Sequence, residues 1–205
     1  MSFVKQSLLL LLLAAVGTYT VTEDCDGLNR TLSATNFHKV LGDWVLVLAV
    51  SDTVALQMTF ITNSHVQILP KDDSNTILFV ERNKYISNVC ANYNVTMKYP
   101  SEEHIVEVIS TVMEQNGTVV HINDTAKAEF FETEENSLVM YYRGFLGRFL
   151  FIYRRDGHHV DFQVTKEAEA DYHKLAGCVN LSLDNRANYK EAGDFCHKKY
   201  SPDRA

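Results

Sequence analysis

The sequence predicts an all-β fold that is followed by one α-helix. Stretches rich in apolar, β-branched and aromatic residues follow one another from residue 42 to residue 155. The connections between them are short and carry Asp, Asn and Gly, as in "KDDSN" (71–75), "QNG" (115–117) and "RDG" (155–157). Consecutive strands with short turns form an antiparallel sheet that closes into a barrel or folds into a sandwich.

The expected strands occupy most of the chain. They cover residues 42–50, 56–69, 76–82, 90–99, 104–112, 117–122, 126–133, 137–143 and 148–155, with 159–164 as a weaker addition. The spacing of apolar residues then becomes helical over 165–178, where Tyr172, Leu175 and Ala176 share a face. Thr165 is placed to cap this helix and Gly177 to end it. A second, shorter helix is expected over 186–192.

The first residues have the features of a secretory signal peptide. Lys5 precedes an unbroken apolar run from Leu8 to Val16, and small residues follow. The run is too short to cross a bilayer, which needs about 20 residues. We therefore expect residues 1–20 to be removed by cleavage near 17–20, leaving residues 21–205 as a single domain.

The charge balance disfavours nucleic acid and anionic membranes as partners. The formal net charge is −7, and it becomes −8 when Lys5 leaves with the signal peptide. An acidic chain without a basic stripe has no surface that would attract phosphates. No later segment is apolar and long enough to span a membrane. We expect a secreted, extracellular protein of a body fluid such as blood plasma, and a monomer.

All the cysteines lie after the predicted cleavage site, at Cys25, Cys90, Cys178 and Cys196. An even number in an exported chain predicts two disulfides. A zinc site would need closely spaced pairs such as C-x2-C, which the sequence lacks. Four cysteines allow three pairings, and the sequence alone does not choose among them.

Five N-x-[ST] motifs support export independently. They begin at Asn29, Asn94, Asn116, Asn123 and Asn180, and none has proline in the middle position. Each occupied site must lie on the surface, since a glycan is bulky. The sequence therefore predicts a glycoprotein.

The single tryptophan of the chain opens the first expected strand. It stands in "NFHKVLGDWVLVLAV" (36–50), two residues after a glycine. This block, followed by a run of strands and one late helix, resembles the lipocalins. The resemblance implies an eight-stranded antiparallel up-and-down barrel with one C-terminal α-helix. Gly42 and Trp44 would then form the plug at the closed end, where a large rigid side chain fills a narrow barrel.

Other segments resemble one branch of that family, the alpha-1-acid glycoprotein (orosomucoid) group. They are "ISNVCANYNVT" (86–96) and the tail "YHKLAGCVNLSLDNRANYKEAGDFCHKKY" (172–200). The resemblance implies the disulfides Cys25–Cys178 and Cys90–Cys196. The chain departs from the pattern in two places. In the lipocalins an arginine after the helix usually stacks on the tryptophan. Here no residue matches it well, and Arg186 is the nearest candidate. The stretch between Cys90 and "QNGT" (115–118) is longer than the pattern by about the length of residues 100–112, which would form an extended hairpin or an insertion at the barrel mouth.

A small barrel that is closed at one end has room for one small ligand at the other. Alternation along the strands, counted from an inward Trp44, gives the side chains that could line such a cavity. Each of them could equally fill a packed core. The candidates are Leu46, Leu48, Met58, Phe60, Ile77, Phe79, Met140, Tyr142, Phe149, Phe151 and Tyr153, with Val50 and Leu138 on the same faces and Tyr141 and Arg143 outside.

The aromatic-rich interior favours a hydrophobic or amphipathic ligand: a lipid, a steroid, a drug-like amine or a xenobiotic. Fish members of the family that bind tributyltin or toxins have a similar general character, so tributyltin or a toxin is among the expected ligands. An acidic residue at the rim would select cations. The candidates are Glu81, Glu129, Glu132 and Glu134, although each of them also fits a solvated surface position.

Other classes of function fit less well. No G-x-S-x-G or H-E-x-x-H motif is present, and all cysteines are expected to pair, so we expect no enzyme and no cofactor. His158, His159 and His173 lie close together in sequence, but the adjacent pair would point to opposite faces of a strand, so no metal site is expected. An immunoglobulin-like module would place its tryptophan in mid-strand. An immune-modulating glycoprotein without a specific ligand stays open as the alternative to a carrier.

Overall fold

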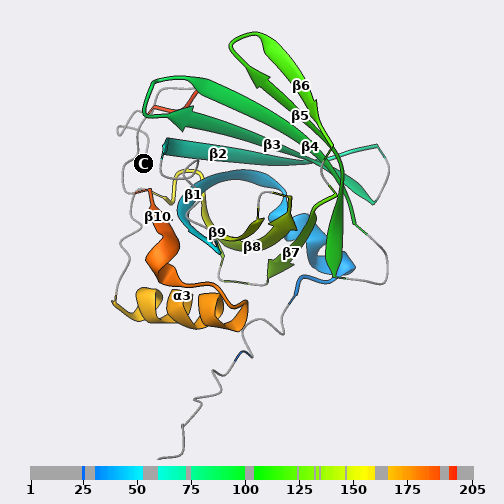
Figure 1. The fold of residues 1–205 in the computed structure, drawn as a ribbon. Coiled ribbons are helices and arrows are strands. Elements are labelled where there is room, and N and C mark those ends of the chain that lie inside the picture. The colour runs from blue at the N-terminus through cyan, green and yellow to red at the C-terminus, as the bar shows by residue number, and fades with distance from the viewer. Residues whose placement is uncertain are drawn as a thin grey trace, which may run out of the picture.

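Eight antiparallel strands close into a barrel in the computed structural model (Figure 1). The structure describes residues 25, 31–52, 60–72, 75–99, 104–123, 125–131, 133, 135–145, 147–159, 166–189 and 194–197. Neighbouring strands pair in the order β1-β2-β3-β4-β5-β7-β8-β9, and the pairing of β1 with β9 completes the ring. The strands are β1 (Gly42–Ser51), β2 (Ile61–Pro70), β3 (Thr76–Tyr85), β4 (Cys90–Lys98), β5 (Ile105–Gln115), β7 (Lys127–Phe131), β8 (Ser137–Gly144) and β9 (Gly147–Arg155).

Several predictions concern residues outside the described part of the chain. They are the signal peptide (1–20), the glycosylation site Asn29, the lining candidate Met58, the acids Glu132 and Glu134, and the weak strand at 159–164 apart from residue 159. No helix among the described residues has the length and apolar character needed to cross a membrane.

Two further strands extend the sheet. β5 pairs with β7 only at Ile105–Glu107, and its outer half pairs with β6 (Thr118–Ile122), so the described part of the 100–112 stretch is a barrel strand that continues into an extended hairpin (Figure 1). β10 (Arg186–Asn188) pairs with β1 at Leu48–Val50, a part of β1 that β2 does not cover. The helix expected over 186–192 is therefore wrong at its start, because β1 offers an unpaired edge there.

The buried apolar residues form two layers. One lies inside the barrel around Trp44 and Phe130, and the other lies outside, beneath α3 (Lys166–Cys178), whose Ala176 is 1% exposed. Figure 1 shows α3 beside the barrel next to β10. The predicted C-terminal helix is confirmed, and its apolar face covers the outer layer.

A β-bulge in β1 corrects the prediction for Leu48 and Val50. Leu46 pairs with Tyr153 and Leu48 pairs with Ile152, so Val47 is an extra residue on β1. Because side chains alternate with a period of two, one extra residue reverses the faces of everything that follows. Leu48 and Val50 therefore pack in the outer layer beneath α3 and do not face the interior.

A short 3-10 helix closes one end of the barrel. This segment, η2 (Ala34–Val40), leads directly into β1, and Trp44 donates a hydrogen bond from Nε1 to the Val40 carbonyl at 2.8 Å. Phe37 of η2 packs against Tyr99 and Phe130, with ring centroids 4.3 and 5.6 Å away. Trp44 is only 2% exposed. Trp44, the predicted plug, thus lies at the closed end, and η2 both covers its ring and accepts its hydrogen bond.

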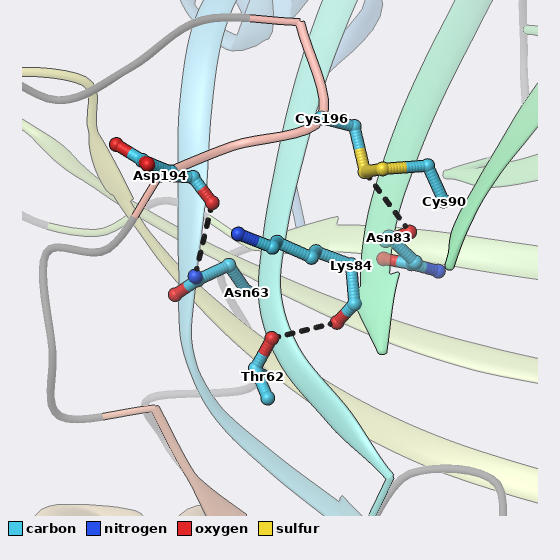
Figure 2. The surroundings of a disulfide bond; sticks show 7 residues. All are labelled: Thr62, Asn63, Asn83, Lys84, Cys90, Asp194 and Cys196. Carbon is cyan, nitrogen blue, oxygen red and sulfur yellow. Dashed lines mark hydrogen bonds between the residues drawn. A yellow bond between two sulfur atoms is a disulfide. The ribbon is translucent and has the colours of Figure 1, made fainter. Parts of the chain in front are cut away.

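The disulfides are Cys25–Cys178 and Cys90–Cys196, which is the pairing that the resemblance implies. The second one ties the C-terminal segment to the start of β4 (Figure 2). Beside it, Asn63 of β2 donates a hydrogen bond to the Asp194 carbonyl at 3.3 Å, and the Cys196 sulfur lies 3.3 Å from the Asn83 carbonyl oxygen (Figure 2). The C-terminal segment is therefore held against β2 and β3.

Candidate ligand-binding cavity

A cavity of about 590 Å³ occupies the barrel interior beyond the Trp44 cluster. Its size is in the range of small-molecule sites, which run from about 300 to 1,000 Å³. Apolar and aromatic side chains dominate the walls. The lining residues are Ile61, Phe79, Glu81, Asn83, Tyr85, Tyr93, Val95, Met97, Val108, Thr111, Met113, Ile122, Asn123, Met140, Tyr142, Phe145, Phe149, Phe151 and Tyr153.

The predicted lining residues divide into those on the cavity wall and those elsewhere. Phe79, Met140, Tyr142, Phe149, Phe151 and Tyr153 are on the wall. Leu46, Ile77 and Leu138 also face inward, but they are buried in the packed layer and are not among the lining residues. Phe60 is 51% exposed before β2 begins, and it borders a separate surface pocket of about 560 Å³. Its assignment to the cavity is wrong because a β-bulge between Ile61 and Asn63 reverses the faces of β2, so that Ile61 and not Phe60 lines the cavity.

One wall of the cavity is a row of aromatic rings on β8 and β9. Phe149 and Phe151 stack with centroids 5.5 Å apart and planes 6° apart. Tyr142 and Tyr153 extend the row at either end, at centroid distances of 6.2 and 6.1 Å. Their spacing follows from alternation along β9, where every second residue faces inward. The row offers an aromatic surface to an apolar ligand.

The facing wall carries a carboxylate. Glu81 lies on β3 between Phe79 and Asn83, all of which face inward. Asn83 donates a hydrogen bond from Nδ2 to Glu81 Oε1 at 2.8 Å, and Ser64 donates a longer one to the same oxygen at 3.5 Å. Burial raises the pKa of Glu81, and the two hydrogen bonds partly oppose that effect. Sequence reasoning placed Glu81 at the rim, whereas the structure places it inside the barrel.

Tyrosines surround this carboxylate. Burial raises the pKa of Tyr93, Tyr153 and Tyr189, and the nearby negative charge of Glu81 adds to the shift in each case. The Tyr85 and Tyr93 hydroxyls lie 3.4 Å apart. Tyr93 and Tyr153 therefore stay neutral at physiological pH, and with Tyr85 they present ring faces and hydroxyl groups to whatever fills the cavity.

The remaining acid candidate within the described residues lies elsewhere. Glu129 is on the outer face of β7, where Arg143 donates a hydrogen bond to it at 2.6 Å. Arg143 also stacks on Tyr141, at 5.4 Å from the ring centroid. The prediction that Tyr141 and Arg143 face outward is confirmed, because Tyr141 belongs to the outer layer.

The arginine that stacks on Trp44 is Arg155, which the sequence analysis missed. Its Cζ lies 4.2 Å from the centroid of the Trp44 ring. Its Nη1 and Nη2 donate hydrogen bonds to the carbonyls of Leu41 and Lys39, at 3.3 and 3.2 Å. Arg186, the candidate after the helix, is exposed on β10. The signal that could have found Arg155 is the pairing of the first and last barrel strands, which sets Arg155 opposite Trp44.

Gly42 makes room for this arginine. Its backbone has φ of +119°, a conformation that side-chain-bearing residues rarely adopt. A Cβ at this position would lie 2.8 Å from Arg155 Nη1. The glycine of the Gly-x-Trp motif is thus required both by its backbone angle and by the close approach of the guanidinium.

The histidines considered as metal ligands do not converge. His158 and His173 are exposed, whereas His159 is buried beside Asp156, with Nδ1 3.7 Å from its Oδ1. Across the ranges that the structure describes, no group of three or more His, Cys, Asp or Glu residues is arranged to hold a metal ion.

Solved structures share this architecture. The amine binding protein of Rhodnius prolixus, solved as a tryptamine complex, superposes with a TM-score of 0.57 over 78% of this chain and 83% of its own, at 13% identity. The chain has the lipocalin fold. Apocrustacyanin C1 superposes with a TM-score of 0.52 over 80% of this chain and 83% of its own, at 12% identity. At these identities the likeness concerns the lipocalin fold alone.

Two curated proteins are more similar to this chain in sequence than these solved structures are. The chain is 36% identical over 184 residues to saxitoxin and tetrodotoxin-binding protein 1 of Takifugu pardalis, which covers 88% of this chain and 46% of the relative. It is 36% identical over 203 residues to protein 2 of the same name and species, with 97% of this chain and 51% of the relative covered. The chain therefore spans about half the length of these homologues. No family model matches the chain.

Proposed function

We propose that this chain is a secreted glycoprotein carrier whose barrel holds one small amphipathic organic cation, such as a toxin. The observation that carries the proposal is the position of Glu81. Among the described residues that line the cavity it is the only one with a formal charge, and the walls around it are largely apolar and aromatic. A ligand with an ammonium or guanidinium group and an apolar body would complement both features.

The carboxylate has no cationic neighbour in the described part of the chain. Its pKa is set by burial and by hydrogen bonds from Asn83 and Ser64, and no Lys, Arg or His contributes. Buried carboxylates are normally paired, because an isolated buried charge costs several kcal/mol. A ligand cation would supply the missing partner.

The geometry leaves one carboxylate oxygen available. Both hydrogen bonds to Glu81 fall on Oε1, and no described residue donates to Oε2. Asn83 and Ser64 would hold the group in place while Oε2 accepts a hydrogen bond from the ligand. The rings of Tyr85, Tyr93 and Tyr153 also line the site, and they would add cation–π attraction of about 0.5–2 kcal/mol each.

The names of the Takifugu relatives support the ligand class. They are saxitoxin and tetrodotoxin-binding proteins, so sequestration of a small toxin is the role we propose for this chain. A lipid, a steroid or tributyltin is the competing cargo, and each belongs in the ligand panel. Because both disulfides consume all four cysteines, a thiol-based isomerase activity is not part of the proposal.

Two matched probes test the proposal. Tryptamine carries an ammonium group, whereas indole-3-ethanol has the same ring and a neutral hydroxyl. We expect both to displace the neutral fluorophore N-phenyl-1-naphthylamine, which accepts energy from Trp44, and we expect tryptamine to bind roughly tenfold to a hundredfold more tightly. Glu81→Gln should remove this difference and keep the binding of indole-3-ethanol. Glu107→Gln, on the exposed face of β5, is the matched control.

Each contrary result has a distinct meaning. If the fluorophore does not bind the folded, disulfide-paired protein, the carrier function is wrong. If it binds but the two indoles compete equally well, the cation preference alone is wrong, and the panel of fatty acids, steroids, tributyltin and the two named toxins would then identify the cargo. As a test of location, Val108→Phe should fill the cavity and weaken binding, whereas Ile109→Phe, exposed on the outer face, should not.

Secretion and glycosylation have their own support. Of the five motifs, Asn94, Asn116, Asn123 and Asn180 are described, and all four side chains are exposed. Expression in a eukaryotic secretory host should release the chain into the medium without residues 1–20. Peptide-N-glycosidase should lower the mass of the protein, and each single Asn→Gln variant should lower it by the mass of one glycan. Retention inside the cell with an intact N-terminus would contradict this part of the proposal.

A further inference from the structure

We propose that the free edge of β6 is a self-association surface for a second copy of this chain, and that N-glycans on Asn116 and Asn123 keep it closed. This inference rests on the glycosylation part of the proposed function and not on the ligand. It concerns the β5–β6 hairpin, which projects beyond the barrel (Figure 1).

β6 is an edge strand. Its only partner among the described strands is β5, with Gln115 opposite Thr118 next to the turn. That turn is the two-residue Asn116-Gly117, in which both residues have positive φ, at 52° and 77°. In such a hairpin the pair that closes the turn is hydrogen-bonded, and so is every second pair after it. Thr118, Val120 and Ile122 therefore direct their backbone groups to β5, and Val119 and His121 direct theirs to the free edge.

The free edge is self-complementary. Two copies related by a two-fold axis at Val120 would place Val119 of each copy opposite His121 of the other. Residues that are opposite in a hydrogen-bonded antiparallel pair exchange both N–H···O=C bonds. The outward backbone groups of Val119 and His121 would then all be satisfied. This match is why the occupant we assign to the edge is a second copy.

The strand itself has none of the usual protection. Edge strands are commonly guarded by lysine, proline, inward charges or a bulge. β6 reads "TVVHI", without Lys, Arg, Asp, Glu or Pro, and its pairing with β5 has no register shift. Val119 and Val120 are 57% and 40% exposed. An uncharged, β-branched, exposed edge is the composition that promotes pairing between chains.

The two glycosylation motifs bracket this edge. Asn116 lies in the turn before β6, and Asn123 follows its last residue, Ile122. Both side chains are exposed. Asn116 is three positions before Val119, and Asn123 is two positions after His121. A bulky glycan at each end would prevent a second strand from lying along the edge.

The test compares two double variants that each remove two glycans. Asn116→Gln/Asn123→Gln should form dimers or larger species in sedimentation velocity at concentrations where the wild type is monomeric. Asn94→Gln/Asn180→Gln removes the same number of glycans from β4 and from the segment after α3, and it should stay monomeric. Adding Val119→Lys to the first variant should restore the monomer, because a charge at the edge opposes pairing.

Several outcomes would overturn the inference. Mass spectrometry that finds Asn116 and Asn123 unmodified in a monomeric wild type would do so. So would a monomeric Asn116→Gln/Asn123→Gln variant, or equal association by both double variants. Binding of N-phenyl-1-naphthylamine is measured on every variant, since Asn123 also borders the cavity, so loss of the carrier function is scored separately.

Discussion

The guanidinium of Arg155 covers the ring of Trp44, with Cζ 4.2 Å from its centroid, and so joins the last barrel strand to the first. Its two hydrogen bonds to the Leu41 and Lys39 carbonyls also satisfy the backbone at the junction of η2 and β1. The closed end of the barrel therefore depends on one side chain from a strand that is more than a hundred residues away in sequence.

Replacement of Arg155 should destabilise the protein. Arg155→Ala removes a cation–π contact and two charge-assisted hydrogen bonds, and we expect a loss of roughly 2–4 kcal/mol in the free energy of unfolding. Arg155→Lys should lose less, because it keeps the charge. Urea titration followed by Trp44 fluorescence measures both. Arg186→Ala, exposed on β10, is the comparison, and an equal loss there would contradict the role of Arg155.

Gly42→Ala should cost more than the same change at Gly157. Both positions have positive φ, at +119° and +92°, so both variants carry backbone strain of about 1–3 kcal/mol. Only at Gly42 does the new methyl group meet Arg155, since a Cβ at Gly157 has no heavy atom within 4 Å. Thermal unfolding should show the difference, and Arg155→Ala in the same chain should shrink it. A difference unchanged in the Arg155→Ala background would refute the contact.

Glu81→Gln should stabilise the unliganded protein at neutral pH. Burial raises the folded-state pKa of Glu81 above its ordinary value of 4.5, so the folded state holds a proton more tightly than the unfolded chain. Wild-type stability is therefore fully present below pH 4.5 and falls as the pH rises through the folded-state pKa. A pKa difference of one corresponds to about 1.4 kcal/mol. Thermal melts at pH 4 and pH 8 should show that the variant gains only at pH 8, and a gain of equal size at both would rule out the carboxylate as its cause.

Removal of the disulfides should have unequal effects on binding. In the chain-entropy model each bond stabilises by about 4–5 kcal/mol, because the bonds close loops of 153 and 106 residues. The double alanine variant of Cys90 and Cys196 should also bind tryptamine several-fold more weakly, because Cys196 touches the backbone of Asn83, which positions Glu81 (Figure 2). The double alanine variant of Cys25 and Cys178 should lose stability but keep its affinity for tryptamine. Calorimetry on both folded variants compares the affinities, and equal affinities would contradict the link between the Cys90–Cys196 disulfide and Glu81.

Phe145 should contribute to binding and not to folding. It lies in the β8–β9 turn, lines the cavity, and is 89% exposed. Phe145→Ala should weaken binding of an apolar ligand by about tenfold. Full burial of a phenyl group contributes about 1.5–3 kcal/mol, and a tenfold change in affinity corresponds to about 1.4 kcal/mol. Unfolding should change by about 0.5 kcal/mol or less. Ile109→Ala, on the outer face of β5, is the control. It should leave both the affinity and the free energy of unfolding nearly unchanged.

Much of the fold was readable from local pattern. Alternating apolar residues, turn residues and one helical segment were enough to predict the antiparallel strands and α3, because each of these is a property of neighbours in sequence. The resemblance to the lipocalins then selected the closed barrel and implied the disulfide pairing that the structure contains. The sequence also indicated which end of the barrel is closed, because Gly42 and Trp44 stand together at the start of β1.

The cavity wall was predictable only in part. Counting by twos succeeded along β9, which has no bulge within its inward residues, and it failed beyond Val47, where one extra residue reverses the faces of β1. Phe60 was misassigned because a one-residue bulge between Ile61 and Asn63 puts Ile61, and not Phe60, on the inward face. An error of one position changes a side chain from interior to exterior, so boundaries and bulges matter more here than composition does.

By itself the sequence determined the class of fold, the closed end and the glycosylation motifs, all of which depend on short stretches of chain. The tertiary structure alone decided that Arg155 covers Trp44, that Glu81 faces an aromatic wall inside the barrel, and that the edge of β6 is left unpaired among the described strands. Those three facts depend on which distant strands lie side by side, and ring closure sets that relation through hydrogen-bond register, which no local pattern of residues records.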